Sequence, residues 1–319
     1  MNHKPMLNAY PDSLGGNLGD IVTLLKTEAM QDVFSSFYIL PSLYHSDLDR
    51  GFSVIDYDLN EQLADREDLD QLKNMGIDLK LDFILNHASA QSPQFQDLVE
   101  KGEASAYRDF FIDWNRFWEG HGTMTEEGYI QPEESCLKQM FFRKPGLPIL
   151  MVEFPDGKKV PYWNTFYQEV HGRQYLGQMD VNIQSPKVWE FYRETLEKIA
   201  SYGAAIVRLD AFAYAPKTPG KTFSMIRRHG NFYRRFMRWQ NLWDLRFCRR
   251  STQRMTKKYT RRLRKKAMRP TIFSCRDWSL MRLRTGAEHT LRHGRRKLWK
   301  RRSPRSTCLA VTTASRFWI

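Results

Sequence analysis

The chain has 319 residues and a formal net charge of +14, with 41% hydrophobic and 13% aromatic residues. This length is sufficient for one large core or for two smaller domains. No stretch approaches the roughly 18 consecutive apolar residues of a membrane-spanning helix, so we expect no transmembrane segment. The N-terminal residues lack the apolar region of a signal peptide, and we therefore expect a cytoplasmic location.

The charge is distributed unevenly, with a change of character near Gly220. Residues 1–220 hold 20 Lys and Arg against 33 Asp and Glu, whereas residues 221–319 hold 30 against 3. The first segment has 8 Arg and 12 Lys, and the second has 23 Arg and 7 Lys. The overall charge therefore averages an acidic segment with an arginine-rich one and describes neither.

The first half of the acidic segment alternates apolar runs with helical patterns. We expect strands over residues 6–10, 36–40 and 77–85, and helices over residues 19–28 and 61–75. Such alternation is typical of βα units that form a parallel sheet.

A long aromatic-rich insertion, residues 89–175, precedes the last predicted unit. Pro186 then begins a helix that ends at Gly203, because proline suits the first helical turn and glycine the residue after the helix. A further strand covers residues 204–209. Each of the four predicted strands is followed by polar residues at its carboxyl end, where (β/α) barrels place their chemistry.

Candidate catalytic side chains lie at two of these strand ends and in the segment between them, which carries Gln178, Asp180 and Asn182. The third strand leads from Asp82 into Asn86 and His87, and the fourth carries Arg208 and Asp210. Alternate residues of a strand face one side, so Arg208 and Asp210 point the same way. A neighbouring guanidinium favours the ionised carboxylate. A glycosidic nucleophile needs this charge, while a separate carboxylic acid protonates the leaving group.

Each motif also has a simpler interpretation. Arg208 and Asp210 could form a structural ion pair, Asn86 and His87 could form a turn, and Asp180 with Asn182 could cap the helix that follows. The order and spacing of the three motifs together favour a catalytic site.

At these positions the chain resembles the α-amylase superfamily of retaining glycosidases and transglycosidases. The segments DFILNH (82–87), QMDVN (178–182) and IVRLDAFAY (206–214) match three signature segments of that superfamily in order. Residues 29–60, which include an Asp-x-Gly-Phe element at Asp49, resemble the second-strand region of its sucrose phosphorylase branch. The similarity covers essentially all of residues 1–220.

The resemblance implies an α/β fold, the (β/α)8 TIM barrel of the α-amylase type, of which about four βα units and an inserted B domain are encoded in frame. The domains expected on this basis are the first βα units, the B domain, the fourth βα unit with the nucleophile, and the arginine-rich segment. They cover residues 1–88, 89–175, 176–220 and 221–319.

The resemblance also assigns roles residue by residue. Asp210 matches the nucleophile that forms a β-glucosyl-enzyme, and Arg208 would orient it. The residues expected to bind the glucosyl hydroxyls or line the same subsite are Asp49, His87 and Gln178. The residues expected to support the strand ends are Asp82, Asn86 and Asp180.

The implied reaction is a double displacement with net retention. Asp210 takes glucose from sucrose or a related α-glucoside, and inorganic phosphate captures it as α-glucose 1-phosphate. The leaving group (fructose, fructose 6-phosphate, glycerol or glycerate) stays open. The alternative is a hydrolase of the same superfamily, with water in place of phosphate. The resemblance implies no cofactor and no metal, and it is compatible with a homodimer.

Two catalytic segments of the superfamily have no counterpart in residues 221–319. One supplies the acid/base glutamate and the other a His-Asp pair, but the only acids here are Asp244, Asp277 and Glu288. Read from the third base of each codon, residues 246–253 permit V-L-P-E-I-H-A and residues 306–319 permit N-M-L-G-C-H-D-G-I-P-V-L-D. We therefore predict a frameshift from about Lys221, a segment 221–319 without native fold, and an inactive literal chain.

A basic extension that binds nucleic acid is the other interpretation of residues 221–319. A net charge of +27 over 99 residues would attract polyanions, with a steep dependence on salt. No nucleic-acid-binding motif with its required spacing is present. We therefore expect neither nucleic acid nor a membrane as a partner.

Overall fold

The structure, a computed structural model, describes most of the first 219 residues and a few short stretches beyond them. The described residues are 4–137, 146–166, 175, 177–212, 214–219, 232, 234–236, 238–239, 242–249 and 308–310.

A six-stranded parallel sheet forms the centre of the molecule, in the order β13-β12-β5-β2-β1-β14. Four strands are those predicted from the sequence, with ends that agree within one residue: β1 (Met6–Ala9), β2 (Ser36–Ile39), β5 (Asp78–Ile84) and β12 (Ala204–Asp210). Because all are parallel, their carboxyl ends lie along one edge of the sheet.

The two outer strands come from the arginine-rich segment. β13 (Arg246–Arg249) pairs with β12, and β14 (Cys308–Ala310) pairs with β1. No closed barrel is formed by the described residues, because β13 and β14 stand at opposite ends of the sheet. Most of residues 221–319 lies outside the described residues, so the predicted frameshift and absence of a native fold stay predictions.

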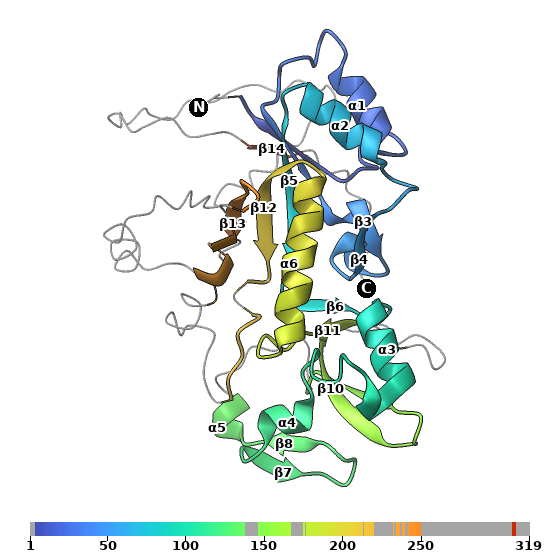
Figure 1. The fold of residues 1–319 in the computed structure, drawn as a ribbon, viewed down its shortest axis with the longest axis vertical. Helices are drawn as coiled ribbons and strands as arrows, with labels where there is room; N and C mark the ends of the chain where they lie inside the picture. Colours follow the sequence, from blue (N-terminus) through green and yellow to red (C-terminus); the bar gives the residue numbers. More distant parts are fainter. Residues whose placement is uncertain are drawn as a thin grey trace, which may run out of the picture.

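Helices α1, α2 and α6 accompany the sheet (Figure 1). α1 (Leu18–Leu25) and α2 (Arg66–Asn74) contact each other, and α6 (Pro186–Ser201) packs along β12 and β5. The helix predicted over residues 61–75 begins later, because Asp65 caps α2 in a reciprocal capping box. None of the helices in the described ranges combines the length and apolar character needed to cross a bilayer.

Short elements connect β2 to α2 beside the carboxyl edge of the sheet. They are η1 (Pro41–Leu43), β3 (Tyr44–Ser46), η2 (Asp49–Gly51) and β4 (Val54–Leu59), with β3 and β4 paired antiparallel.

The insertion has a sheet and a small core of its own. Its sheet runs β6-β11-β10-β9 and is antiparallel throughout. Trp114, Trp118 and Trp163 pack together in a second apolar cluster, apart from the main core. Its elements are β6 (His87–Ser89), α3 (Pro93–Lys101), η3 (Gly102–Ala104), α4 (Trp114–Trp118), β7 (Gly122–Met124), β8 (Ile130–Pro132), α5 (Glu134–Leu137), β9 (Ile149–Glu153), β10 (Lys159–Phe166) and β11 (Gln178–Asp180).

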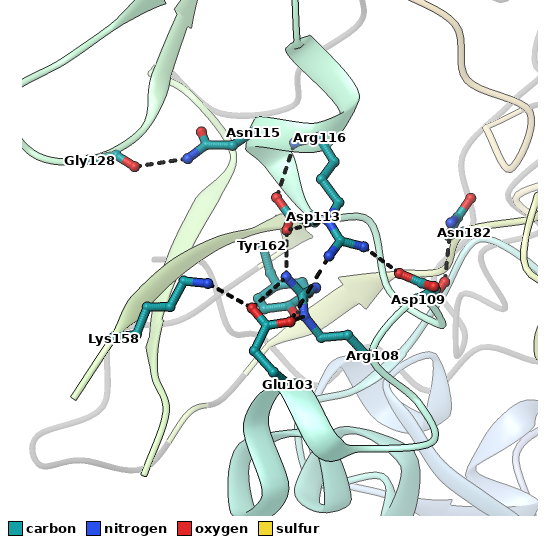
Figure 2. Close-up of polar contacts among 10 residues, drawn as sticks. All are labelled: Glu103, Arg108, Asp109, Asp113, Asn115, Arg116, Gly128, Lys158, Tyr162 and Asn182. Atoms are coloured by element: carbon teal, nitrogen blue, oxygen red, sulfur yellow. Dashed lines mark hydrogen bonds and ion pairs between the residues drawn. The ribbon is translucent and has the colours of Figure 1, made fainter. Parts of the chain in front are cut away.

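A cluster of charged residues around Arg108 connects separate segments of the insertion (Figure 2). The Arg108 guanidinium donates to Glu103 at 2.8 Å, to the Tyr162 hydroxyl at 2.8 Å and to Asp113 at 3.0 Å. Arg108 is only 9% exposed, so the cluster satisfies a charge that has been taken out of water. The Asn182 amide donates to the Asp109 carbonyl at 3.1 Å and thereby links the cluster to the segment after β11.

Candidate active site

Two parallel strands bring the predicted nucleophile and its guanidinium together. In the register of β5 and β12, Arg208 lies opposite Asp82, and Asp210 lies opposite Ile84. The Arg208 guanidinium donates to Asp82 through Nη1 and to Asp210 Oδ1 through Nη2, the latter at 2.5 Å. One cation therefore holds both carboxylates at the carboxyl ends of neighbouring strands.

The two carboxylates differ in their exposure to solvent. Asp82 is fully buried, and the side chain of Asp210 keeps 13% exposure. Burial raises the pKa of Asp82, and Arg208 offsets this only in part. Burial works against the charge of Arg208, but Asp82 and Asp210 still raise its pKa above the usual arginine value. Asp82 thus binds the guanidinium from the buried side, and Asp210 is the more exposed of the two carboxylates.

Tyr38 completes the support of Asp82. Its hydroxyl, on β2, donates to Asp82 Oδ2 at 2.6 Å. The sequence analysis missed this residue, because a tyrosine near a strand end has no signal that separates a hydrogen-bond donor from an ordinary core aromatic.

His87 begins β6, which pairs with the strand β11 that carries Asp180, and Asn86 directly precedes β6. The Asn86 amide donates to Asp180 Oδ2 at 2.8 Å, and β6 and β11 place His87 opposite Asp180. His87 Nε2 lies 3.1 Å from the Phe52 carbonyl, so this nitrogen carries a proton. Burial lowers the pKa of His87, although Asp180 and Asp210 oppose the shift, and the neutral ring is favoured.

Lys217 is a further member of the site that the sequence analysis did not single out. Its ammonium donates to Asn86 Oδ1 at 2.7 Å and to the Tyr214 carbonyl at 2.9 Å, and it pairs with Asp180 Oδ2 at 2.7 Å. Burial lowers the pKa of Lys217, and Asp180 acts in the opposite direction. The only available signal was a lysine seven residues after Asp210, which does not by itself predict this contact.

The loop at η2 contacts both β11 and Arg208. Gln178 is buried on β11, and its amide lies 3.5 Å from Asp49 Oδ2. The ring of Phe52, three residues after Asp49, lies 5.7 Å from the Arg208 guanidinium carbon. Through these contacts all eight predicted site residues belong to one region at the carboxyl edge of the sheet. They are Asp49, Asp82, Asn86, His87, Gln178, Asp180, Arg208 and Asp210.

A parallel α/β sheet with its polar side chains gathered at the carboxyl edge is the arrangement of α/β enzymes, the TIM barrel among them. Within this class, the model of the alpha-amylase catalytic domain matches residues 10–230. The chain belongs to the alpha-amylase family. The α-amylase resemblance predicted from the three signature segments is confirmed.

Relatives point to the same branch. Over 224 residues the chain is 58% identical to sucrose 6(F)-phosphate phosphorylase of Ilumatobacter coccineus, covering 69% of this chain and 43% of the relative. Over 217 residues it is 35% identical to sucrose phosphorylase of Streptococcus mutans, covering 67% and 41%. The chain thus spans less than half the length of these two relatives.

A solved structure agrees. The crystal structure of sucrose 6F-phosphate phosphorylase from Thermoanaerobacter thermosaccharolyticum superposes with a TM-score of 0.68 at 29% identity, covering 78% of this chain and 48% of that chain. The similarity to the sucrose phosphorylase branch predicted from residues 29–60 is confirmed by these relatives.

Proposed function

We propose that this chain carries the glucosyl subsite and the nucleophile of a retaining phosphorylase acting on sucrose or a related α-glucoside. The observation that carries the proposal is Asp210 at the carboxyl end of β12, hydrogen-bonded to Arg208 and partly exposed. Relatives named for phosphorolysis of sucrose or its 6(F)-phosphate support this choice over a hydrolase.

The first step uses Asp210 as the nucleophile. A carboxylate oxygen bonds to the anomeric carbon of glucose while the bond to the leaving-group oxygen breaks, and that oxygen takes a proton from a separate acid. Arg208 donates to Oδ1 of Asp210, so the second oxygen of the carboxylate stays oriented for attack on the anomeric carbon.

In the second step, an oxygen of inorganic phosphate bonds to the anomeric carbon, its proton returns to the conjugate base of that acid, and the ester bond to Asp210 breaks. The product is α-glucose 1-phosphate, with configuration retained by the two inversions. Asp49, His87 and Gln178 act on the sugar as hydrogen-bonding groups, with Asp82, Asn86 and Asp180 behind them.

The names of the relatives, taken in order of sequence identity, indicate which substrates to test first. The relative with 58% identity is named for sucrose 6(F)-phosphate, and others are named for sucrose, glucosylglycerol and glucosylglycerate. We therefore place sucrose 6(F)-phosphate and sucrose first as substrates.

The open sheet supports the proposal that only half of a barrel is encoded in frame. β13 lies beside β12, where a fifth barrel strand would stand, and the codons of residues 246–253, which begin with β13, permit V-L-P-E-I-H-A in the shifted frame. The glutamate of that segment overlaps the codons of Arg249 and Arg250, the second of which lies outside the described residues. The missing acid/base is thus encoded, in our proposal, in the alternative frame.

The test restores the frame by a one-base change near codon 221. We call the product the restored-frame protein. It should release α-glucose 1-phosphate from sucrose 6(F)-phosphate or sucrose only when phosphate is added. Free glucose released at the same rate without phosphate would support the hydrolase instead.

Asp210→Asn is the decisive control in the restored-frame protein. The amide keeps the shape of the side chain but cannot form the glucosyl ester, so turnover should fall at least ~10⁴-fold. Retained phosphorolysis in this variant would refute the assignment. Size-exclusion chromatography of the same protein tests whether it is a homodimer.

A further inference from the structure

The η2 loop contains three consecutive residues with positive φ: Asp49 at 57°, Arg50 at 46° and Gly51 at 100°. A side chain disfavours this left-handed conformation by about tenfold in population at each residue. Gly51 is required, because a Cβ there would lie 2.1 Å from the backbone nitrogen of Ser42. Asp49 and Arg50 have side chains, so contacts elsewhere must hold them in this conformation.

Arg50 is held by the turn that follows β1. Its Nη2 donates to both carboxylate oxygens of Asp12 at 2.8 Å, and its guanidinium carbon lies 4.2 Å from the centre of the Tyr10 ring. We call this group the Tyr10–Asp12–Arg50 clamp. It joins a loop to a turn 38 residues earlier in the chain.

The clamped loop supplies two contacts of the active site. The Gln178 amide reaches Asp49, and His87 donates to the carbonyl of Phe52. The backbone of Phe52 in turn donates to the Asp49 carbonyl at 3.2 Å. The conformation of Arg50 therefore decides where Asp49 stands relative to the subsite.

We propose that Tyr10, Asp12 and Arg50 are positioning residues, which hold the strained loop so that Asp49 faces the glucosyl subsite before the sugar arrives. The inference rests on the proposed function. When only a fraction of the molecules has the binding-competent loop, apparent affinity falls by that fraction. Loss of the clamp should therefore raise KM and leave kcat nearly unchanged.

Asp12→Ala and Arg50→Ala remove the clamp but leave the strain at residue 50. In the restored-frame protein each should raise KM for the glucosyl donor about tenfold and change kcat less than about twofold. Arg50→Gly also removes the clamp, but glycine adopts a positive φ readily. Its KM should rise less than about threefold, and adding Asp12→Ala to it should have no further effect.

Lys4→Ala is the matched control. Lys4 pairs at 3.2 Å with Asp32, another exposed residue with positive φ (61°), which precedes β2. The same kind of contact is removed there, but KM should stay unchanged. An Arg50→Gly variant as impaired as Arg50→Ala would show that the arginine side chain acts directly, and would overturn the inference. Unchanged KM in Asp12→Ala would overturn it as well.

Amide hydrogen exchange of the 319-residue chain tests the loop without any activity. Peptides over residues 47–53 should exchange about tenfold faster in Asp12→Ala and Arg50→Ala, and markedly less so in Arg50→Gly. Equal exchange in all variants would overturn the clamp. If the unsubstituted restored-frame protein has no phosphorolysis, the proposed function fails, while the exchange result still decides the clamp.

Discussion

At the scale of single residues, the site is a set of buried charges that each need a partner. Among the residues that the structure describes, the cations paired here are Arg208, between Asp82 and Asp210, and Lys217, against Asp180. Removing one member of such a pair leaves the other charged in a medium of low dielectric. The effect on stability is therefore larger than the net contribution of the pair.

In the restored-frame protein, Asp82→Asn should lower both the free energy of unfolding and the rate of turnover. Arg208 would keep only Asp210 as an anionic partner, and the free energy of unfolding should fall by about 3 kcal/mol. Urea unfolding measures this change. Tyr38→Phe is the milder comparison, because it removes only the hydroxyl that lies 2.6 Å from Asp82. That substitution should lower the free energy of unfolding by about 1 kcal/mol. Equal stabilities of Asp82→Asn and the parent would contradict the buried-pair argument.

His87 should make the fold sensitive to mild acid. Its pKa is lowered in the native state by burial, so below the unfolded value of 6.5 the unfolded chain takes up the proton preferentially. Its contribution to stability is complete above pH 6.5 and is lost as the pH falls, by about 1.4 kcal/mol per unit at most. Urea midpoints between pH 7.5 and 5 should fall less steeply in His87→Gln, and an identical slope would exclude His87 as the cause.

At the scale of elements, the insertion is attached by charge as well as by apolar contact. Arg108 is nearly buried, and Asp113, with a 9% exposed side chain, depends on it. The neighbouring Arg116 forms similar pairs, but its side chain is 56% exposed, so solvent screens them.

Arg108→Met should loosen the insertion and leave the parallel sheet intact. The buried Asp113 loses the Arg108 guanidinium and keeps only the largely exposed Arg116 as a cationic partner among the described residues, which should destabilise this part by about 3 kcal/mol. Limited proteolysis should then cleave within residues 103–166 well before the rest of the chain. Arg116→Ala, the exposed neighbour, should stay within ~1 kcal/mol of the parent. Similar cleavage rates in both variants would assign the cluster no stabilising role.

At the scale of the whole molecule, the described strands form an open sheet whose carboxyl edge carries the candidate site. The family match ends at residue 230, close to the change of charge near Gly220. A barrel with unpaired edges exposes backbone groups that closure would satisfy.

The 319-residue chain should therefore show no measurable phosphorolysis, whereas the restored-frame protein should be active. In our proposal this chain lacks the general acid, and that loss alone removes a contribution of ~10²–10⁴-fold. An intact mass near 37.9 kDa for the natural gene product would contradict the frameshift, as would turnover by the 319-residue chain.

The order of the four central strands β1, β2, β5 and β12 and of the helices α1, α2 and α6 followed from local sequence, because apolar periodicity and capping act over a few residues. The four strands formed within a residue of their expected ends, and Asp210 was identified from the strand that carries it. The start of α2 was missed, since Asp65 was not recognised as a cap.

By itself the sequence determined the parallel α/β core, the family and the carboxylate at the end of β12, because these depend on short-range patterns. Only the tertiary structure decided that Tyr38 supports Asp82, that Lys217 joins Asn86 to Asp180, and that Asp12 holds Arg50. These contacts join segments that are distant in the chain, or they have no pattern in the local sequence that would predict them. Which partner a polar side chain meets is set by the packing of the whole sheet and its loops.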